Sequence, residues 1–215
     1  MAVNRAKYNE IPKGAKIIGE NEALQFQTDL IQRWPNKSDT FAVRYGMYFL
    51  YGATMISGII ITRHFRKKFL LYNYGKFMSL IPITIIPATT GIFFHSEFVL
   101  RDVVLRKNVC PTCLELRSAA FQTFTGTVFP AILAPMGCAS LSQYFGTYNI
   151  PNILKEPKVV FTEFGKMFKP FRTKLWYLFL AQAFCGSAVT YLEMRSVMLI
   201  DKELFGQSEE TELNV

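Results

Sequence analysis

Long uncharged stretches alternate with short charged blocks along this chain, and four of the stretches are strongly apolar. Each is close to the length of about 20 residues that a helix needs to cross ~30 Å of hydrocarbon. Because backbone polar groups in lipid must be paired within the spanning segment, the pattern predicts helices. We therefore expect an all-α fold, an integral membrane four-helix bundle. The predicted spans cover about residues 43–62, 76–96, 118–142 and 174–194.

Two shorter segments have the pattern of amphipathic helices. In NEALQFQTDLIQRWP, residues 21–35, the apolar side chains fall loosely on one face, with Asn21 as the expected cap. In VVFTEFGKMFKPF, residues 159–171, an apolar residue recurs every four positions with lysines between. We expect both helices to lie on the membrane surface, or the first on a partner. The chain then divides into an N-terminal arm (1–40), a transmembrane domain (41–195) and an acidic C-terminal tail (196–215).

Charge is distributed unevenly between the connections. The 215-residue chain has a net charge of +8, but no basic stripe with interleaved aromatic residues indicates nucleic-acid binding. The first and third connections are strongly basic, the second is nearly balanced, and the C-terminal tail is acidic. By the positive-inside rule, the first and third connections face the cytoplasm or the mitochondrial matrix. The termini and the second connection then face the opposite side.

Basic side chains of the first and third connections would share one headgroup layer, which suits an anionic lipid such as cardiolipin. The competing interpretation is that they act only as topology signals. The predicted lipid contacts are Arg66, Lys67, Lys68, Lys166, Lys169, Arg172 and Lys174.

Small residues recur at a spacing of four in three of the spans, and such pairs let helix backbones approach closely. Cys138 and Cys185 belong to these pairs, so we interpret both as packing residues. The span cores contain no carboxylate or histidine pair, which argues against an ion or proton carrier. The small pairs are Ala53 with Ser57, Ala134 with Cys138, and Ala181 with Cys185.

The segment CPTC, residues 110–113, stands just before the third span, and three interpretations compete. A zinc site needs four ligands, and His95 and Glu97 could join Cys110 and Cys113. A membrane dithiol oxidoreductase would carry such a pair at a helix mouth, but it normally needs a second cysteine pair on a loop. The interpretation we favour is a local disulfide or thiol pair that shapes the entry to the span. So small a disulfide ring would add little chain-entropy stabilisation.

Short motifs in a fixed order make the chain similar to a known family. CPTCLELRS, then GTVFPAILAP and a Tyr-containing loop, resemble the transmembrane protein 126 family. HFRKK after the first span and IPATTG late in the second add to the resemblance, which covers roughly residues 40 to 195. The spacing Cys-x-x-Cys-x-x-x-Arg-Ser is most similar to the A paralogue. The residues that carry the match include Cys110, Cys113, Arg117, Ser118 and Pro130.

The resemblance implies a multi-pass protein of the mitochondrial inner membrane. Its basic loops would face the matrix, and its termini and CPTC loop the intermembrane space. It also implies a non-catalytic assembly factor, or chaperone, that holds unassembled membrane-arm subunits of respiratory complex I together with other assembly factors. The family brings no catalytic residues, cofactor, metal or small-molecule substrate. The alternative function is a membrane thiol–disulfide oxidoreductase that uses Cys110 and Cys113.

Overall fold

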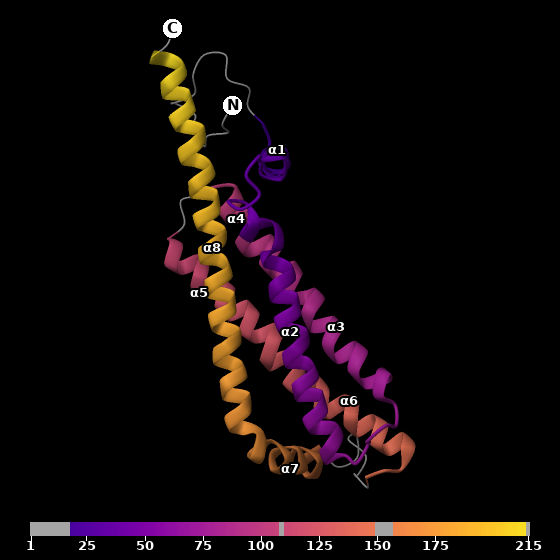
Figure 1. The fold of residues 1–215 in the computed structure, drawn as a ribbon. Helices are drawn as coiled ribbons and strands as arrows, with labels where there is room; N and C mark the ends of the chain where they lie inside the picture. Colours follow the sequence, from indigo (N-terminus) through magenta and orange to yellow (C-terminus); the bar gives the residue numbers. More distant parts are fainter. Residues whose placement is uncertain (1–17, 108–109, 149–156, 214–215) are drawn as a thin grey trace.

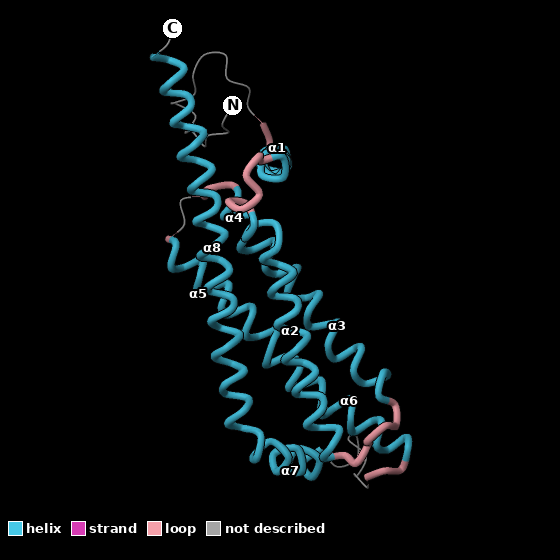
Figure 2. The backbone as a smooth tube through the Cα atoms, in the orientation of Figure 1, coloured by secondary structure: helices cyan, strands magenta, loops and turns pink. Residues whose placement is uncertain are grey.

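The computed structural model describes residues 18–107, 110–148 and 157–213, and within these ranges every regular element is a helix (Figures 1 and 2). The α-helices are α1 (Glu20–Arg33), α2 (Phe41–Lys68), α3 (Lys76–His95), α4 (Arg101–Val104), α5 (Pro111–Thr123), α6 (Phe129–Phe145), α7 (Pro157–Phe168) and α8 (Arg172–Leu213). Two π-helical turns, η2 (Ser96–Leu100) and η3 (Phe124–Val128), and a 3-10 turn, η4 (Lys169–Phe171), join some of them.

Four helical segments of this structure are long and apolar enough to cross a membrane, which confirms the predicted all-α bundle. They run over Phe41–Lys68, Lys76–Val104, Pro111–Phe145 and Lys158–Leu204. Each is longer than the predicted apolar span, because a helix can continue into polar sequence once its backbone groups are paired within the segment. Helix α8 continues past the fourth predicted span and ends at Leu213, within the acidic tail.

The second and third spans pass through π-helical turns without ending. In the third span, η3 lies directly before α6, and Pro130 follows at the beginning of that helix. Proline lacks a backbone donor and clashes with the preceding turn, and a π turn shifts the local hydrogen-bond register. The third span thus remains one rod of α5, η3 and α6 despite its prolines.

This rod crosses the bundle diagonally and organises the packing. Its first half, α5, lies against α8, and its second half, α6, lies against α2 and α3. Helix α2 contacts α3, α6 and α8, so it occupies the centre of the bundle. Figure 1 shows the rod and α3 separating from α8 toward the end where α7 lies, while α2 runs beside α8. On this half of α8 the side chains of Trp176, Leu180 and Phe184 are exposed, and we call this face its open side.

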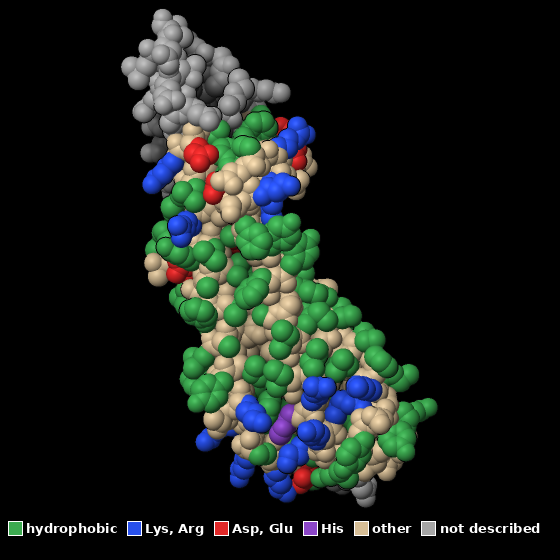
Figure 3. Space-filling model, in the orientation of Figure 1, with side chains coloured by type: hydrophobic (Ala, Val, Ile, Leu, Met, Phe, Trp, Pro, Cys, Tyr) green, Lys and Arg blue, Asp and Glu red, His purple; other side chains and the backbone are tan. Residues whose placement is uncertain are grey.

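The two ends of the bundle differ in charge. The α2–α3 connection, α6 and α7 meet at one end, and α1, α4 and the C-terminal part of α8 lie at the other (Figure 1). The first and third predicted connections thus share an end, as expected for four spans. Figure 3 shows Lys and Arg side chains gathered at the α7 end, which we call the basic end.

Both predicted amphipathic helices are present, and both pack against the bundle. Helix α7 inserts Val160 and Phe164 into a core cluster that includes Phe65 and Phe69. Helix α1 begins after Gly19, earlier than the predicted cap at Asn21. Its buried Ile31 packs with Val104 of α4 and Ile200 of α8. Residues 1–17, 149–156 and 214–215, which include part of the N-terminal arm, the third connection and the tail, lie outside the described ranges.

Candidate functional sites

A buried contact between a histidine and a carboxylate connects the second and fourth spans. His95 at the end of α3 contacts both carboxylate oxygens of Glu193 on α8, with Nε2–oxygen distances of 3.1 and 3.0 Å. The side chain of His95 is 5% exposed and that of Glu193 is fully buried. The expectation that the span cores lack a carboxylate or histidine pair is therefore wrong. The two residues stand 98 positions apart and at the edges of their predicted spans, so neither was read as intramembrane.

Ser118 of α5 completes the site. Its hydroxyl donates to the Gly186 carbonyl at 3.0 Å, so it can only accept from His95, whose Nδ1 lies 3.3 Å away. The imidazole of His95 is thus held from both sides, by Glu193 at Nε2 and by Ser118 at Nδ1.

Glycines create the space for this pair. A Cβ added at Gly46 of α2 would lie 2.8 Å from Oε1 of Glu193. A Cβ added at Gly186 would lie 2.9 Å from the Ser118 carbonyl oxygen and 3.1 Å from Cα of Ala119. Close helix approach at small residues is the usual device for packing in lipid. Here it allows three helices to converge on one carboxylate.

A second polar cluster follows one turn away, with Gln122 of α5 at its centre. Its side-chain nitrogen donates to Gln182 Oε1 at 2.7 Å, to Thr54 Oγ1 at 3.1 Å and to the Leu50 carbonyl at 3.2 Å. Gln182 in turn donates to the Ala53 carbonyl at 2.9 Å. The Gln122 and Gln182 side chains thus tie α5 and α8 to α2.

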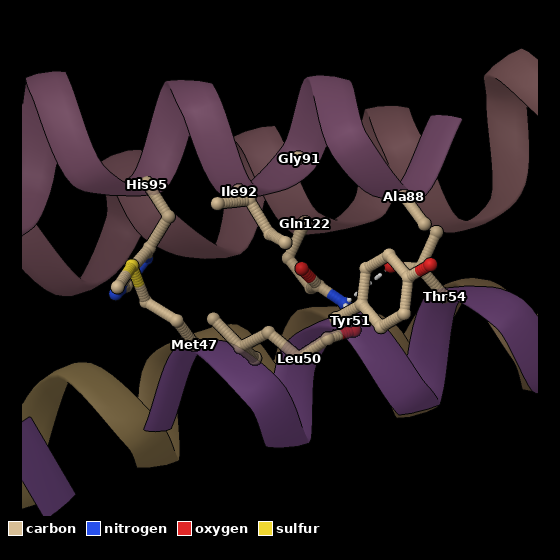
Figure 4. A pocket seen from close by; sticks show the side chains of 9 residues that line it. All are labelled: Met47, Leu50, Tyr51, Thr54, Ala88, Gly91, Ile92, His95 and Gln122. Atoms are coloured by element: carbon tan, nitrogen blue, oxygen red, sulfur yellow. Dashed lines mark hydrogen bonds between the residues drawn. The ribbon is translucent and has the colours of Figure 1, made fainter. Parts of the chain in front are cut away.

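A narrow crevice between α2 and α3 leads to these groups. Figure 4 shows Met47 and Tyr51 of α2 opposite Ile92 of α3, with Gln122 behind them and His95 at one end. The crevice is mostly apolar and too tight to admit a water molecule. Its complete lining is Met47, Leu50, Tyr51, Thr54, Ala88, Gly91, Ile92, His95 and Gln122. The side chains of Gln122 and Gln182 form hydrogen bonds between helices, and these bonds fix the positions of the helices relative to one another.

The CPTC thiols lie at the end of the bundle opposite the basic end, at the beginning of α5. Cys110 is the N-cap, Pro111 the first helical residue, and the Cys113 N–H donates to the Cys110 carbonyl at 3.0 Å. Both thiols are free and exposed. Backbone and side-chain hydrogen bonds from Cys113 lower the pKa of Cys110.

The four residues of the zinc interpretation are not brought together. His95 points into the bundle core and is occupied by Glu193 and Ser118, while Cys110 and Cys113 are exposed on α5. Within the described residues, no group of three or more His, Cys, Asp or Glu side chains could hold a metal ion. Cys138 is fully buried in the core cluster with Phe65 and Ile83, as predicted for a packing residue.

The other motif residues hold helices in place. Arg117 of α5 bonds Asp102 of α4 at 3.1 Å and the Phe98 carbonyl at 3.0 Å. Asp102 also binds Lys107, at 2.9 Å, and Lys107 binds Glu20 of α1 at the same distance. Hydrogen bonds to Glu20 and Asp102 raise the pKa of Lys107, so this side chain stays protonated at neutral pH. Ser118 belongs to the His95 site, and Pro130 is buried where α6 begins.

At the basic end, Arg66 differs from the rest of the predicted lipid-contact set. It is buried, and its guanidinium donates to the carbonyls of Tyr72, Tyr74 and Gly75 and to the Ser79 hydroxyl. It therefore shapes the α2–α3 connection and is not available to lipid. The exposed members are Lys67, Lys68, Lys166, Lys169, Arg172 and Lys174.

The exposed lysines of α2 and α8 converge. Lys67 and Lys68 from α2 and Lys174 from α8 are all close enough for their charges to act on His64. His64 is held in place, because it stacks on Phe171 with ring centroids 4.2 Å apart and contacts the Met167 carbonyl. Sequence reasoning identified the lysines but not the histidine around which they gather.

Four apolar helices, a polar core closed between them and a basic end define a multi-pass helical membrane protein. A family model described as Transmembrane protein 126 matches residues 22–207. "Transmembrane protein 126" of Drosophila melanogaster is 34% identical over 217 residues, which cover 99% of this chain and 97% of that relative. The chain therefore belongs to the transmembrane protein 126 family, which confirms the resemblance. No solved structure matches it.

Proposed function

We propose that this protein is a non-catalytic assembly factor that holds unassembled membrane-arm subunits of respiratory complex I in the mitochondrial inner membrane. The proposal follows from what membership of the family implies. In this arrangement the basic end faces the matrix, and the CPTC segment faces the intermembrane space, in agreement with the positive-inside rule. Its partners are hydrophobic subunits and other assembly factors.

The observation that carries the proposal is the open side of α8. Only 22% of the most apolar window of the Lys158–Leu204 segment is buried, against 50% for Pro111–Phe145. The side chains of Trp176, Leu180 and Phe184 recur every four residues and are all exposed. A helix face of this kind can pack against helices of another membrane protein without rearranging the bundle.

Native-gel separation of gently solubilised mitochondria, with mass spectrometry of each slice, tests the function. We expect the tagged protein to migrate with partial membrane-arm assemblies and to be absent from finished complex I. Migration alone, near its own mass, would rule the assembly role out. Migration with the finished complex would make the protein a subunit instead.

Truncating the open side of α8 is expected to release the partners. The double variant Leu180→Ala, Phe184→Ala should weaken the binding of membrane-arm subunits by roughly 30-fold or more, because anchoring side chains cost about 1–2 kcal/mol each when truncated and 1.4 kcal/mol is about tenfold. The matched control is Ile86→Ala, Phe93→Ala, which removes exposed apolar side chains from α3. Equal losses from both double variants would mean that α8 is not the contact surface.

The alternative function, a membrane dithiol oxidoreductase, is not favoured by the remaining cysteines. Such an enzyme needs a second reactive pair on a loop. Cys138 is fully buried in α6, and Cys185 lies within α8, where it is partly buried. Neither can relay electrons to or from an exposed substrate.

The converging lysines also support a role for lipid. We propose that the basic end binds the phosphate headgroups of an anionic lipid such as cardiolipin. Lys67 and Lys68 of α2 and Lys174 of α8 lie close enough to His64 for their charges to act on it. A topology signal does not require lysines of two spans to lie this close together. An anionic headgroup there would link α2 to α8, at the end where α8 diverges from the rod formed by α5 and α6.

Removing these lysines is expected to abolish selectivity for anionic lipid. Each basic side chain near an anionic surface contributes about 1 kcal/mol, so Lys67→Gln, Lys68→Gln, Lys174→Gln should weaken binding by about 100-fold. The readout is the rise in melting temperature when cardiolipin replaces phosphatidylcholine in the detergent micelle. Arg195→Gln, Lys202→Gln removes exposed charges at the other end and should keep the full rise. A triple variant that responds like the wild type would end the lipid proposal.

A further inference from the structure

We propose that Cys110 and Cys113 form a thiol–disulfide exchange site, in which Cys110 attacks a disulfide and Cys113 resolves the mixed disulfide that results. The inference does not rest on the assembly function, because it concerns the local chemistry of one helix end. It describes a single exchange event on an exposed pair, which needs no second cysteine pair and no quinone.

The geometry places both thiols in one turn. The N–H groups of Cys113 and Leu114 both donate to the Cys110 carbonyl, at 3.0 and 3.2 Å. Pro111 holds the first helical position, where its fixed φ is already suited to the helix. The side chains of Cys110 and Cys113 are close enough to hydrogen-bond to each other, and both are free and exposed. A disulfide-bearing partner can reach them, and the second thiol lies within reach of the first.

The two thiols are chemically unequal. Cys110 is the N-cap of α5, where the N–H groups of the first turn point toward its side chain. The backbone N–H of Cys113 is the largest contribution that lowers the Cys110 pKa, followed by the Cys113 thiol. A lower pKa increases the thiolate fraction at neutral pH, and the thiolate is the attacking species. Cys113 sits inside the first turn and supplies the donor, so it is suited to act second.

The exchange balances as two displacements. The Cys110 thiolate attacks one sulfur of the partner disulfide, forms a mixed disulfide and releases one partner thiolate. Cys113 then loses its proton to solvent, and its thiolate attacks the Cys110 sulfur and releases the second partner thiolate. The chain is oxidised by two electrons to an internal disulfide, and the partner disulfide is reduced to two thiols. The ring of this disulfide is small and adds little chain-entropy stabilisation.

The two thiols lie next to residues that connect α5 to other helices of the bundle. One turn after Cys113, Arg117 binds Asp102 of α4, and Asp102 connects through Lys107 to Glu20 of α1. Ser118, next to Arg117, belongs to the buried His95 site. The first turn of α5 is thus joined to the elements that close this end of the bundle.

Trapping the mixed disulfide tests the order of attack. The reduced, full-length protein in detergent is treated with oxidised glutathione and followed by intact-mass spectrometry. The Cys113→Ser variant should accumulate one glutathione on Cys110, about tenfold faster than Cys110→Ser accumulates it on Cys113. The wild type should instead pass to an internal disulfide. The double variant Cys110→Ser, Cys113→Ser measures any reaction at Cys138 and Cys185.

Alkylation supplies an independent readout. In Cys113→Ser, the rate of iodoacetamide labelling at Cys110 should reach half its maximum at a lower pH than that of glutathione labelled alongside. The backbone N–H responsible for the largest effect remains in this variant. Equal labelling profiles for Cys110 and glutathione, or equal glutathione uptake by the two single variants, would overturn the proposal.

The source of the disulfide is identified in cells. Non-reducing gels of Cys113→Ser should show either a protein-sized adduct, which assigns a protein disulfide, or a glutathione-sized one, which assigns a small disulfide. Absence of both adducts would overturn the proposal. Because co-migration with complex I subunits is measured separately, failure here leaves the assembly function standing.

Discussion

Replacing Glu193 with alanine is expected to lower the free energy of unfolding by about 3–5 kcal/mol, the usual cost of removing one partner from a buried charged pair. Glu193 is fully buried, and its carboxylate contacts Nε2 of His95 of α3 at 3.0 Å. Without it, His95 keeps its bond to Ser118 but has an unpaired Nε2 in an apolar site. The cavity left beside Gly46 adds to the loss.

Thermal unfolding of the detergent-solubilised protein, followed by tryptophan fluorescence, measures this loss. Glu203→Ala is the matched control, because Glu203 is an exposed glutamate on the same helix. The double variant His95→Leu, Glu193→Leu should recover part of the stability, since it removes both polar groups rather than stranding one. If Glu193→Ala and Glu203→Ala have the same melting temperature, the contact between His95 and Glu193 does not stabilise the bundle.

The four spans could be predicted from sequence because uncharged runs of this length usually form membrane-spanning helices. Their ends could not, because the helices continue into polar turns such as 96–104, where Arg101 and Asp102 are already outside the apolar run. Hydropathy locates the apolar segment that can lie in lipid, whereas backbone hydrogen bonding determines the residue at which the helix ends. The same reasoning explains why α8 runs on to Leu213.

The polar core was missed because its members are far apart in sequence and each has an ordinary explanation alone. Glu193 nevertheless carried a signal: it stands four residues from Val189 and four from Val197, and all three are buried. A carboxylate on an apolar helix stripe needs a partner. Arg66 carried the same kind of signal, since it follows the buried Thr62 by one turn. Counting it with its exposed neighbours Lys67 and Lys68 obscured its structural role.

Substitution of Gly186 by alanine is expected to destabilise the bundle by about 1–3 kcal/mol, the cost of overpacking a close contact. The added Cβ would lie 2.9 Å from the Ser118 carbonyl oxygen and 3.1 Å from Cα of Ala119. These are backbone atoms, so α5 and α8 must separate as whole helices. That separation would also stretch the bond from the Ser118 hydroxyl to the Gly186 carbonyl.

Gly52 of α2 makes the comparison decisive, because a Cβ there meets nothing within 4 Å. Glycine in a helix interior costs about 0.5–1 kcal/mol relative to alanine, so Gly52→Ala should raise the melting temperature, while Gly186→Ala lowers it. The same chemical change thus gives opposite signs at two positions, and only the helix contact differs between them. A rise in both would show that α5 and α8 are not in close contact in the membrane. The Ser118–Gly186 contact, which joins α5 to α8 beside the His95 site, would then have to be abandoned with it.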